Sequence, residues 1–159
     1  MNQASHYVDL MQWVMGPVES VMAKTATLAR KIETEDTGVA ILRFRSGALG
    51  VIENSRRAVY GYDVRSEIFG SGGKLVIDAT PKTPLWQFGE NGVSSDHYYF
   101  FMDRFIDAYR LELQAFFAAL EAGTKPTPGT KDAVESLRIA LAMTRSLIER
   151  RPVLLEELR

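Results

Sequence analysis

The stretch Thr37–Asn54, TGVAILRFRSGALGVIEN, decides the class of the fold. It contains two segments rich in β-branched and other apolar residues, Thr37–Arg45 and Ala48–Asn54, which only Ser46-Gly47 separates. A connection this short is typical of a hairpin turn, so the two segments are predicted to be neighbouring antiparallel strands.

Further strands are predicted on both sides of this hairpin. The chain from Val18 to about Phe88 is rich in Val, Ile, Thr, Phe and Tyr, and turn residues recur in it at short intervals. The junction Ser71-Gly72-Gly73 predicts a second hairpin. The remaining strands are expected at Val18–Leu28, Val64–Phe69, Lys74–Ile77 and Leu85–Phe88. Together these segments predict one meandering sheet.

Helices are predicted before and after the strands. Apolar residues recur at spacings of three and four in Asn2–Met15, in Phe105–Leu120 and in Val134–Ile148. Thr130 is expected to cap the last helix with its hydroxyl, and Pro152 to end it.

The order helix, strands, helix, helix groups the strands together. It predicts an α+β domain of two layers, in which an open, largely antiparallel sheet is covered on one face by helices. A doubly wound, parallel dinucleotide-binding fold is not expected. With 46% hydrophobic and 25% charged residues, the 159 residues predict one domain, 1–159, with one compact core.

Charge and cysteine content exclude several classes of function. The net charge is -1, and the Lys and Arg residues are scattered, so a nucleic-acid partner is not expected. The absence of cysteine excludes thiol catalysis, disulfides and thiolate metal sites, and is compatible with the reducing cytoplasm, where we expect the protein. No stretch approaches the roughly 20 apolar residues that cross a bilayer, so a membrane partner is not expected either.

Asn2, His6 and Asp9 form the first candidate site. Their spacing of four and three places them on or near one face of the predicted helix. A histidine is suited to accept an alcohol proton near neutral pH, and a neighbouring amide or carboxylate can orient its ring or hold a substrate hydroxyl. On spacing alone, a packed helix with solvated polar residues is the simpler interpretation. No metal is expected, because asparagine is a poor ligand and His97 is the only other histidine.

The second candidate site is Arg56–Arg65, RRAVYGYDVR, in which phenols and guanidinium groups surround a glycine. If the segment is extended, Tyr60 and Tyr62 point to the same side. Two phenols offer a stacking surface and hydrogen bonds to a polyhydroxylated ring. The alternative is a strand edge covered by aromatic rings and solvated arginines.

Met1–Leu10, MNQASHYVDL, followed by Trp13 and Gly16, resembles the helix that opens the C-terminal domain of the Gfo/Idh/MocA oxidoreductases. Further segments resemble the inositol 2-dehydrogenase members and follow in the same order: Asn54–Glu67, Phe69–Gly73, Arg104–Tyr109 and Glu112–Gln114. The resemblance covers almost the whole chain. It implies a C-terminal substrate-binding and oligomerisation domain.

The resemblance also implies a reaction, the transfer of a hydride from a ring CH–OH of a polyol or sugar to NAD or NADP. His6 matches the histidine of the family that takes the hydroxyl proton, and Tyr60 or Tyr62 matches a substrate-contacting tyrosine, with Tyr62 favoured. Asn2 is expected to contact substrate, but it stands where inositol dehydrogenases usually carry an aspartate. Related enzymes that oxidise UDP-linked N-acetylhexosamine uronic acids at position 3 tend to carry asparagine there, so both substrate classes stay open.

Cofactor binding and assembly are also implied by the resemblance. The nucleotide-binding Rossmann fold of the family, with its glycine fingerprint and active-site lysine, lies upstream of the segments matched here. We therefore expect this chain alone to be inactive. Family members associate through the open face of the sheet, which implies a homodimer or homotetramer, and a non-catalytic assembly module is a further alternative.

Overall fold

The computed structural model describes residues 4–29 and 31–158 and divides the chain into two compact units. Unit 1 comprises residues 1–57 and 125–159, and unit 2 comprises residues 58–124. One hydrophobic core is present, as predicted, but every residue of it belongs to unit 1. No described helix is long and apolar enough to cross a membrane.

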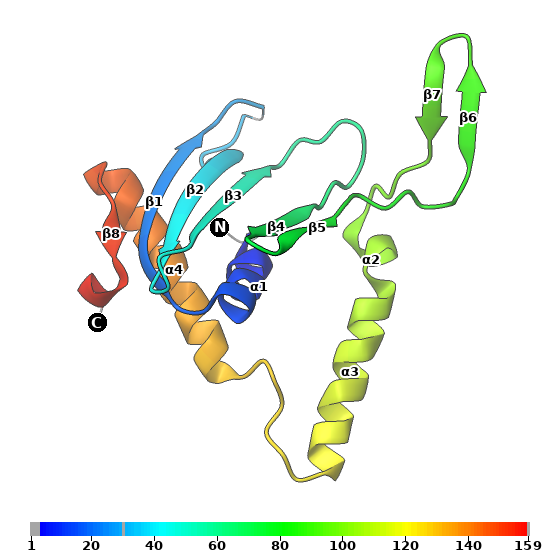
Figure 1. Ribbon diagram of the computed structural model, residues 1–159. Coiled ribbons are helices and arrows are strands. Elements are labelled where there is room, and N and C mark those ends of the chain that lie inside the picture. The colour runs from blue at the N-terminus through cyan, green and yellow to red at the C-terminus, as the bar shows by residue number, and fades with distance from the viewer. Residues whose placement is uncertain (1–3, 30, 159) are drawn as a thin grey trace. The chain divides into compact units, whose positions relative to one another are not determined.

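Unit 1 is one antiparallel sheet with helices on one face (Figure 1). The sheet has the strand order β3-β2-β1-β8, and each strand pairs antiparallel with its neighbours. This confirms the predicted α+β class and the hairpin at Ser46-Gly47. The elements of unit 1 are α1 (Ser5–Met15), β1 (Val18–Ala26), β2 (Thr37–Phe44), β3 (Leu49–Ser55), α4 (Thr130–Glu149), β8 (Val153–Leu154) and the 3-10 turn η1 (Leu155–Glu157).

The core of unit 1 lies between the sheet and the helices α1 and α4. Strand β2 alternates, with Leu42 and Phe44 buried and Ile41 exposed on the opposite face. Val8 of α1 and Ile139 of α4 are buried with them. Burial of a side chain such as Phe44, which is 0% exposed, stabilises the fold by roughly 1.5–3 kcal/mol.

The last helix differs from the prediction at both of its ends. Thr130 is its first residue rather than its cap, because Gly129 occupies the N-cap position and donates its N–H to Asp132 Oδ2 at 2.7 Å. The helix ends before Pro152, at Glu149, where Arg150 adopts a left-handed conformation with φ 56°.

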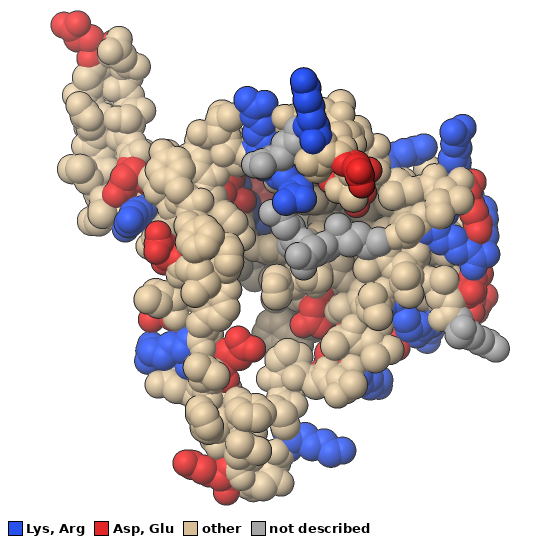
Figure 2. Space-filling model, turned by 180° about the vertical axis from the view of Figure 1, so that it is seen from behind, with Lys and Arg blue, Asp and Glu red and all other residues tan. Residues whose placement is uncertain are grey.

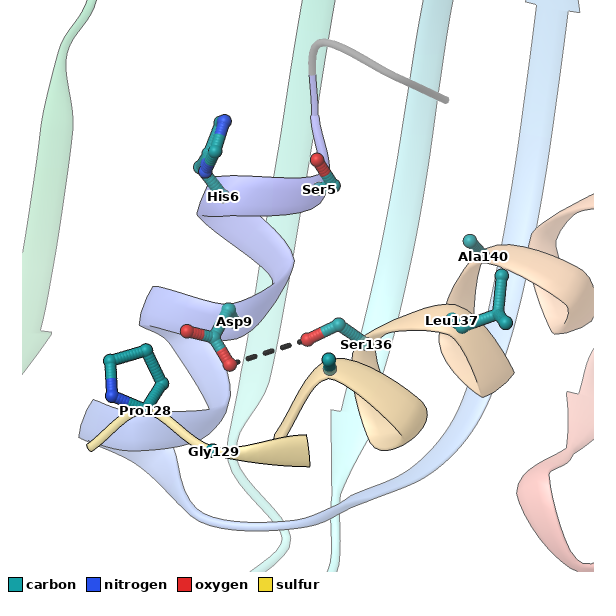
Figure 3. A pocket seen from close by; sticks show the side chains of 9 residues that line it. Ser5, His6, Asp9, Pro128, Gly129, Ser136, Leu137 and Ala140 are labelled. Carbon is teal, nitrogen blue, oxygen red and sulfur yellow. Dashed lines mark hydrogen bonds between the residues drawn. The ribbon is translucent and has the colours of Figure 1, made fainter. Parts of the chain in front are cut away.

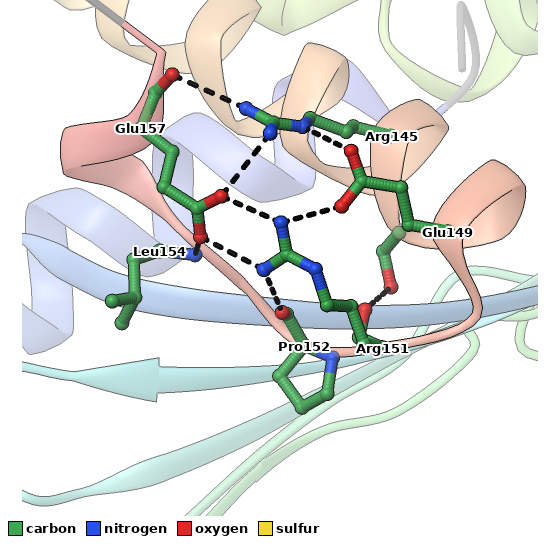
Figure 4. A network of polar contacts seen from close by, with 7 residues as sticks. Arg145, Glu149, Arg151, Pro152, Leu154 and Glu157 are labelled. Carbon is green, nitrogen blue, oxygen red and sulfur yellow. Dashed lines mark hydrogen bonds and ion pairs between the residues drawn. The ribbon is translucent and has the colours of Figure 1, made fainter.

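Polar contacts hold the C-terminal segment on α4 (Figure 4). Arg151 Nη2 lies 2.7 Å from Glu157 Oε2 and also pairs with Glu149, while Arg145 contacts both glutamates. The Leu154 N–H donates to Glu157 Oε1 at 2.9 Å. The Arg151 guanidinium and this N–H lower the pKa of Glu157 to about 2. The short strand β8, which was not predicted, is thereby fixed at the edge of the sheet.

Unit 2 consists of two separate hairpins and two helices, and the prediction of one meandering sheet is therefore wrong. Each hairpin pairs only with itself, and the connection between them contains Pro81 and Pro84, which lack the N–H that a strand ladder requires. The elements are β4 (Ser66–Gly70), β5 (Gly73–Ile77), β6 (Trp86–Gly89), β7 (Gly92–Ser95), α2 (Phe101–Arg104) and α3 (Ile106–Glu121), of which β7 and α2 were not predicted.

Unit 2 has no apolar core. All of its residues, 58–124, are described, and the buried one among them is Gly61. Large side chains such as Phe69 and Phe88 are 83% and 77% exposed. Figure 2 shows the β6–β7 hairpin as a surface that is nearly free of charged side chains.

Candidate functional site

An open hollow lies within unit 1, between α1 and the beginning of α4 (Figure 3). Its volume of about 470 Å³ is in the range of small-molecule sites, roughly 300–1,000 Å³. It is lined by Ser5, His6, Asp9, Pro128, Gly129, Ala133, Ser136, Leu137 and Ala140.

Asp9 and Ser136 tie the two walls of the hollow together. Ser136 Oγ donates to Asp9 Oδ1 at 3.3 Å and accepts a hydrogen bond from Gln12 Nε2 at 3.4 Å. The second carboxylate oxygen of Asp9 has no hydrogen-bond partner among the described residues. These contacts link α1 to α4, in addition to the packing of Val8 and Ile139 in the core.

His6 stands at the rim of this hollow, one helical turn before Asp9. It is exposed, and in Figure 3 its ring points away from the Asp9–Ser136 pair. It forms no hydrogen bond or ion pair with another described residue, so no contact of this kind lets Asp9 orient the imidazole. Within residues 4–29 and 31–158, the ring nitrogens thus have no protein partner. Asn2, predicted on the same face, lies outside the described residues.

Tyr60 and Tyr62 belong to unit 2, and neither lies in a strand. Gly61 has a φ of 126°, which interrupts the extended conformation on which a shared orientation of the two phenols depended. Tyr60 Oη donates to Asp63 Oδ2 at 2.8 Å. The Tyr62 ring instead packs edge-on against Phe105, with centroids 5.9 Å apart. The two phenols thus have different surroundings.

The phenol of Tyr62 is the more available of the two. Its hydroxyl has no hydrogen-bond partner among the described residues, although the ring is only 37% exposed. Burial, and to a lesser extent the neighbouring Tyr109, raise the pKa of Tyr62, so the phenol stays neutral. Because His6 and the tyrosines lie in different units, their meeting around one substrate stays a prediction.

The strands and the glycine-rich run of the described residues are not arranged as in a doubly wound dinucleotide fold. Every strand pair among them is antiparallel, and the glycine-rich run Gly70–Gly73 forms the turn between β4 and β5 rather than a turn before a helix. In the same part of the chain, no three side chains of His, Asp or Glu gather in a way that can hold a metal ion.

Sequence comparison finds relatives among the inositol dehydrogenases. The family model described as GFO/IDH/MocA C-terminal domain matches residues 1–76. Myo-inositol 2-dehydrogenase from Thermotoga maritima is 40% identical over an alignment of 163 positions, gaps included. The alignment covers 99% of this chain and 49% of the relative. Scyllo-inositol 2-dehydrogenase (NAD(+)) from Bacillus subtilis is 34% identical, over 76% of this chain and 35% of the relative.

Structural comparison agrees with the sequence. The crystal structure of a probable dehydrogenase from Thermotoga maritima superposes with a TM-score of 0.92 and 41% identity, over 97% of this chain and 48% of that one. The chain thus spans about half the length of the first relatives that it matches. It belongs to the GFO/IDH/MocA family, in which it corresponds to the C-terminal domain.

Proposed function

We propose that this chain is the substrate-binding half of an NAD(P)-dependent oxidoreductase that oxidises a ring CH–OH of an inositol-like polyol or sugar. The observation that carries the proposal is His6, whose imidazole has no described partner and borders a hollow of small-molecule size. Two relatives with 40% and 34% identity are named as inositol dehydrogenases, and the name of the second includes NAD(+).

In this proposal His6 accepts the proton of the substrate hydroxyl, which general-base catalysis requires within hydrogen-bond reach. NAD or NADP, when bound, takes the hydride. Since the described residues lack a dinucleotide fold, we assign its binding to the half of the relatives that this chain does not span. The Asp9–Ser136 hydrogen bond keeps α1, and so the backbone of His6, in place against α4.

Asn2 and Tyr62 are proposed to hold further substrate hydroxyls. We favour Tyr62 over Tyr60 because the Tyr60 hydroxyl already donates to Asp63, whereas that of Tyr62 has no described partner. A phenol and an amide both donate and accept, which suits the alternating hydroxyls of a polyol.

A chimaeric enzyme tests the function. Residues 1–159 replace the C-terminal half of the Thermotoga maritima enzyme, and NAD(P) reduction is followed with a panel of inositols and sugars. His6→Ala is expected to lower kcat/KM by about 10²-fold or more, the usual contribution of a general base. Leu10→Ala, on the same helix but outside the lining of the hollow, is the control and should retain activity. Equal activity of the chimaera and its His6→Ala variant would refute the assignment.

Asn2 favours a second candidate substrate, a UDP-linked N-acetylhexosamine uronic acid. An amide cannot serve as the anionic partner that a carboxylate provides to a nearby histidine. If the substrate is a polyol, Asn2→Asp should increase inositol turnover in the chimaera. If it is the nucleotide sugar, Asn2→Asp should leave inositol turnover unimproved, and the UDP-linked sugar should be oxidised by the chimaera with Asn2.

We further propose a homodimer or homotetramer formed through the open face of the four-stranded sheet. Ile41 and Val51 are cross-strand partners on that face, 48% and 64% exposed. Exposed apolar neighbours of this kind are typical of a covered surface. Light scattering should show an oligomer that Ile41→Lys dissociates and Val93→Lys, in unit 2, does not. A monomer at high concentration would contradict this assembly, and an intact oligomer without activity in any chimaera would favour a non-catalytic assembly module.

A further inference from the structure

The proposed chemistry makes no use of a polar cluster around Asp63. Both oxygens of its carboxylate are engaged: Oδ2 accepts from Tyr60 Oη and Oδ1 from Arg65 Nε, each at 2.8 Å. Arg65 Nε also lies 3.4 Å from Asp78 Oδ1, in the residue that follows β5. We refer to Tyr60, Asp63, Arg65 and Asp78 as the Asp63 clamp. Asp63 is partly buried, which by itself raises its pKa, but the hydrogen bonds from Arg65 and Tyr60 and the charge of Arg65 outweigh this and leave the pKa lowered, so the carboxyl remains ionised.

The contacts of the Asp63 clamp bracket Tyr62 in the chain. Its members Tyr60 and Asp63 flank Gly61 and Tyr62 in the chain, so the bond between them turns the segment back on itself. The backbone of the same segment is packed closely: a Cβ on Gly61 would lie 2.6 Å from His97 Cβ and 3.0 Å from the Tyr98 carbonyl oxygen. The N–H of Tyr62 donates to that carbonyl. The backbone on both sides of the Tyr62 side chain is therefore held.

The ring of Tyr62 is packed against another side chain, but its hydroxyl is not bonded to any that the structure describes. Phe105 packs against the ring at an interplanar angle of 85°, while the hydroxyl has no described hydrogen-bond partner. Tyr60 shows the opposite arrangement, because its ring is 54% exposed and its hydroxyl is bound by Asp63. The hydroxyl of Tyr60 therefore fixes the segment, while the hydroxyl of Tyr62 remains able to contact a ligand.

We propose that Asp63 is a positioning residue, which fixes the Tyr60–Arg65 segment so that the Tyr62 phenol is presented to a polyol hydroxyl. The inference rests on the proposed function, because it assigns to Tyr62 a substrate hydroxyl. In addition, Tyr60 fixes the segment whereas Tyr62 contacts the substrate, and Asp63 acts through Tyr62 rather than on the substrate itself.

Kinetics of the active chimaera test this role. Asp63→Asn and Tyr62→Phe are each expected to raise the KM for inositol about fivefold to tenfold, the equivalent of one hydrogen bond. The kcat should change little, because a contact away from the reacting carbon binds ground state and transition state equally. Asp107→Asn, in an exposed ion pair with Arg110 on α3, is the matched control and should leave KM unchanged.

The double variant separates positioning from general stabilisation of unit 2. If Asp63 acts through Tyr62, then Asp63→Asn adds nothing further once Tyr62→Phe is present, and the two effects are not multiplicative. Multiplicative effects, or an unchanged KM in Asp63→Asn, would overturn the inference while leaving the proposed function in place. A chimaera insensitive to His6→Ala would instead remove the proposed function, and the inference with it.

A measurement on the chain itself needs no activity. Tyr60→Phe deletes one hydroxyl of the clamp and no charge, and the titration of labelled Tyr62 is then followed by NMR. The half-buried ring should become more exposed without the clamp, so its raised pKa should fall toward the ordinary value of 10.0. An unchanged Tyr62 pKa in the folded Tyr60→Phe variant would overturn the inference.

Discussion

Unit 1 and unit 2 of this chain are stabilised in different ways. In unit 1, the sheet and the helices α1 and α4 enclose a core in which Leu42, Phe44 and Val153 are fully buried. In unit 2, no apolar side chain is buried, and the order comes from hydrogen bonds and ring contacts. Thr83, for example, donates its N–H and its hydroxyl to the two carboxylate oxygens of Asp96, at 2.9 and 2.8 Å, and closes the base of the β6–β7 hairpin.

Because the two units are stabilised differently, we expect them to respond differently to substitution. A packed core resists polar changes on its surface but loses stability whenever a cavity is created. Two-stranded hairpins are marginally stable by themselves, so unit 2 depends on individual polar contacts. The proposed catalytic group, His6, lies in unit 1, which has the buried core. The proposed substrate contact, Tyr62, lies in unit 2, which depends on individual polar contacts.

The largest effect is expected from Phe44→Ala, which empties a site in the core of unit 1. Removing a fully buried phenylalanine costs about 3–5 kcal/mol of unfolding free energy, measured by urea denaturation. Phe69→Ala in unit 2, where the ring is 83% exposed, is the matched control and should cost less than about 0.5 kcal/mol. A comparable loss at Phe69 would break the comparison, because it would mean that the surface of unit 2 is covered in solution.

A smaller and local effect is expected from Gly61→Ala in unit 2. Its φ of 126° and the close approach of His97 make any side chain there strained, at a cost of roughly 1–3 kcal/mol. Hydrogen exchange should show faster exchange of the Tyr62 amide, with unit 1 unchanged. Gly89→Ala, where an added Cβ meets nothing within 4 Å, is the control. Loss of protection in β1 and β2 as well would show that the two units unfold together.

The smallest effect is expected at the C-terminal network, and it depends on pH. The pKa of Glu157 is lowered from 4.5 to about 2, so the ionised form is favoured by folding. Its stabilisation is therefore complete above about pH 4.5 and is lost as the pH falls toward 2. The Tm of the wild type should exceed that of Glu157→Gln at pH 7, and the gap should close at low pH.

Glu156→Gln is the control for this titration, because the structure describes no ion pair for Glu156. Its Tm at pH 7 should stay close to that of the wild type, because no ion pair is lost. A gap between the wild type and Glu157→Gln that persists unchanged at pH 2 would show that the effect of Glu157 is not electrostatic.

Much of the fold follows from local pattern. The spacing of apolar residues predicted α1, α3 and α4, and the two-residue connection Ser46-Gly47 predicted the β2–β3 hairpin, because both signals lie within a few neighbouring residues. The four-residue strand β6 was predicted, but β7, β8 and α2, which span two to four residues, were missed because segments this short carry little periodicity. The cap at Gly129 was missed because Asp132 reaches back to it.

The candidate site was also predicted only in part from the sequence. The chemistry of His6 and of Tyr60 and Tyr62 was predicted from residue type and from resemblance. The unequal roles of the two phenols were not, because they depend on Asp63 and on the turn at Gly61. The Asp63 carboxylate lay within the segment RRAVYGYDVR, and its three-residue separation from Tyr60 is the signal that was available.

The sequence by itself determined the order of the elements, the α+β class and the side chains able to move a proton or hold a hydroxyl, because these depend on local periodicity and on chemical identity. Only the tertiary structure decided that Ser136 bonds Asp9 from 127 positions away, that the buried apolar residues all gather in unit 1, and that Asp63 binds Tyr60 rather than Tyr62. The physical reason is that a hydrogen bond or a packed contact depends on distance in space, which residues remote in the chain acquire only on folding.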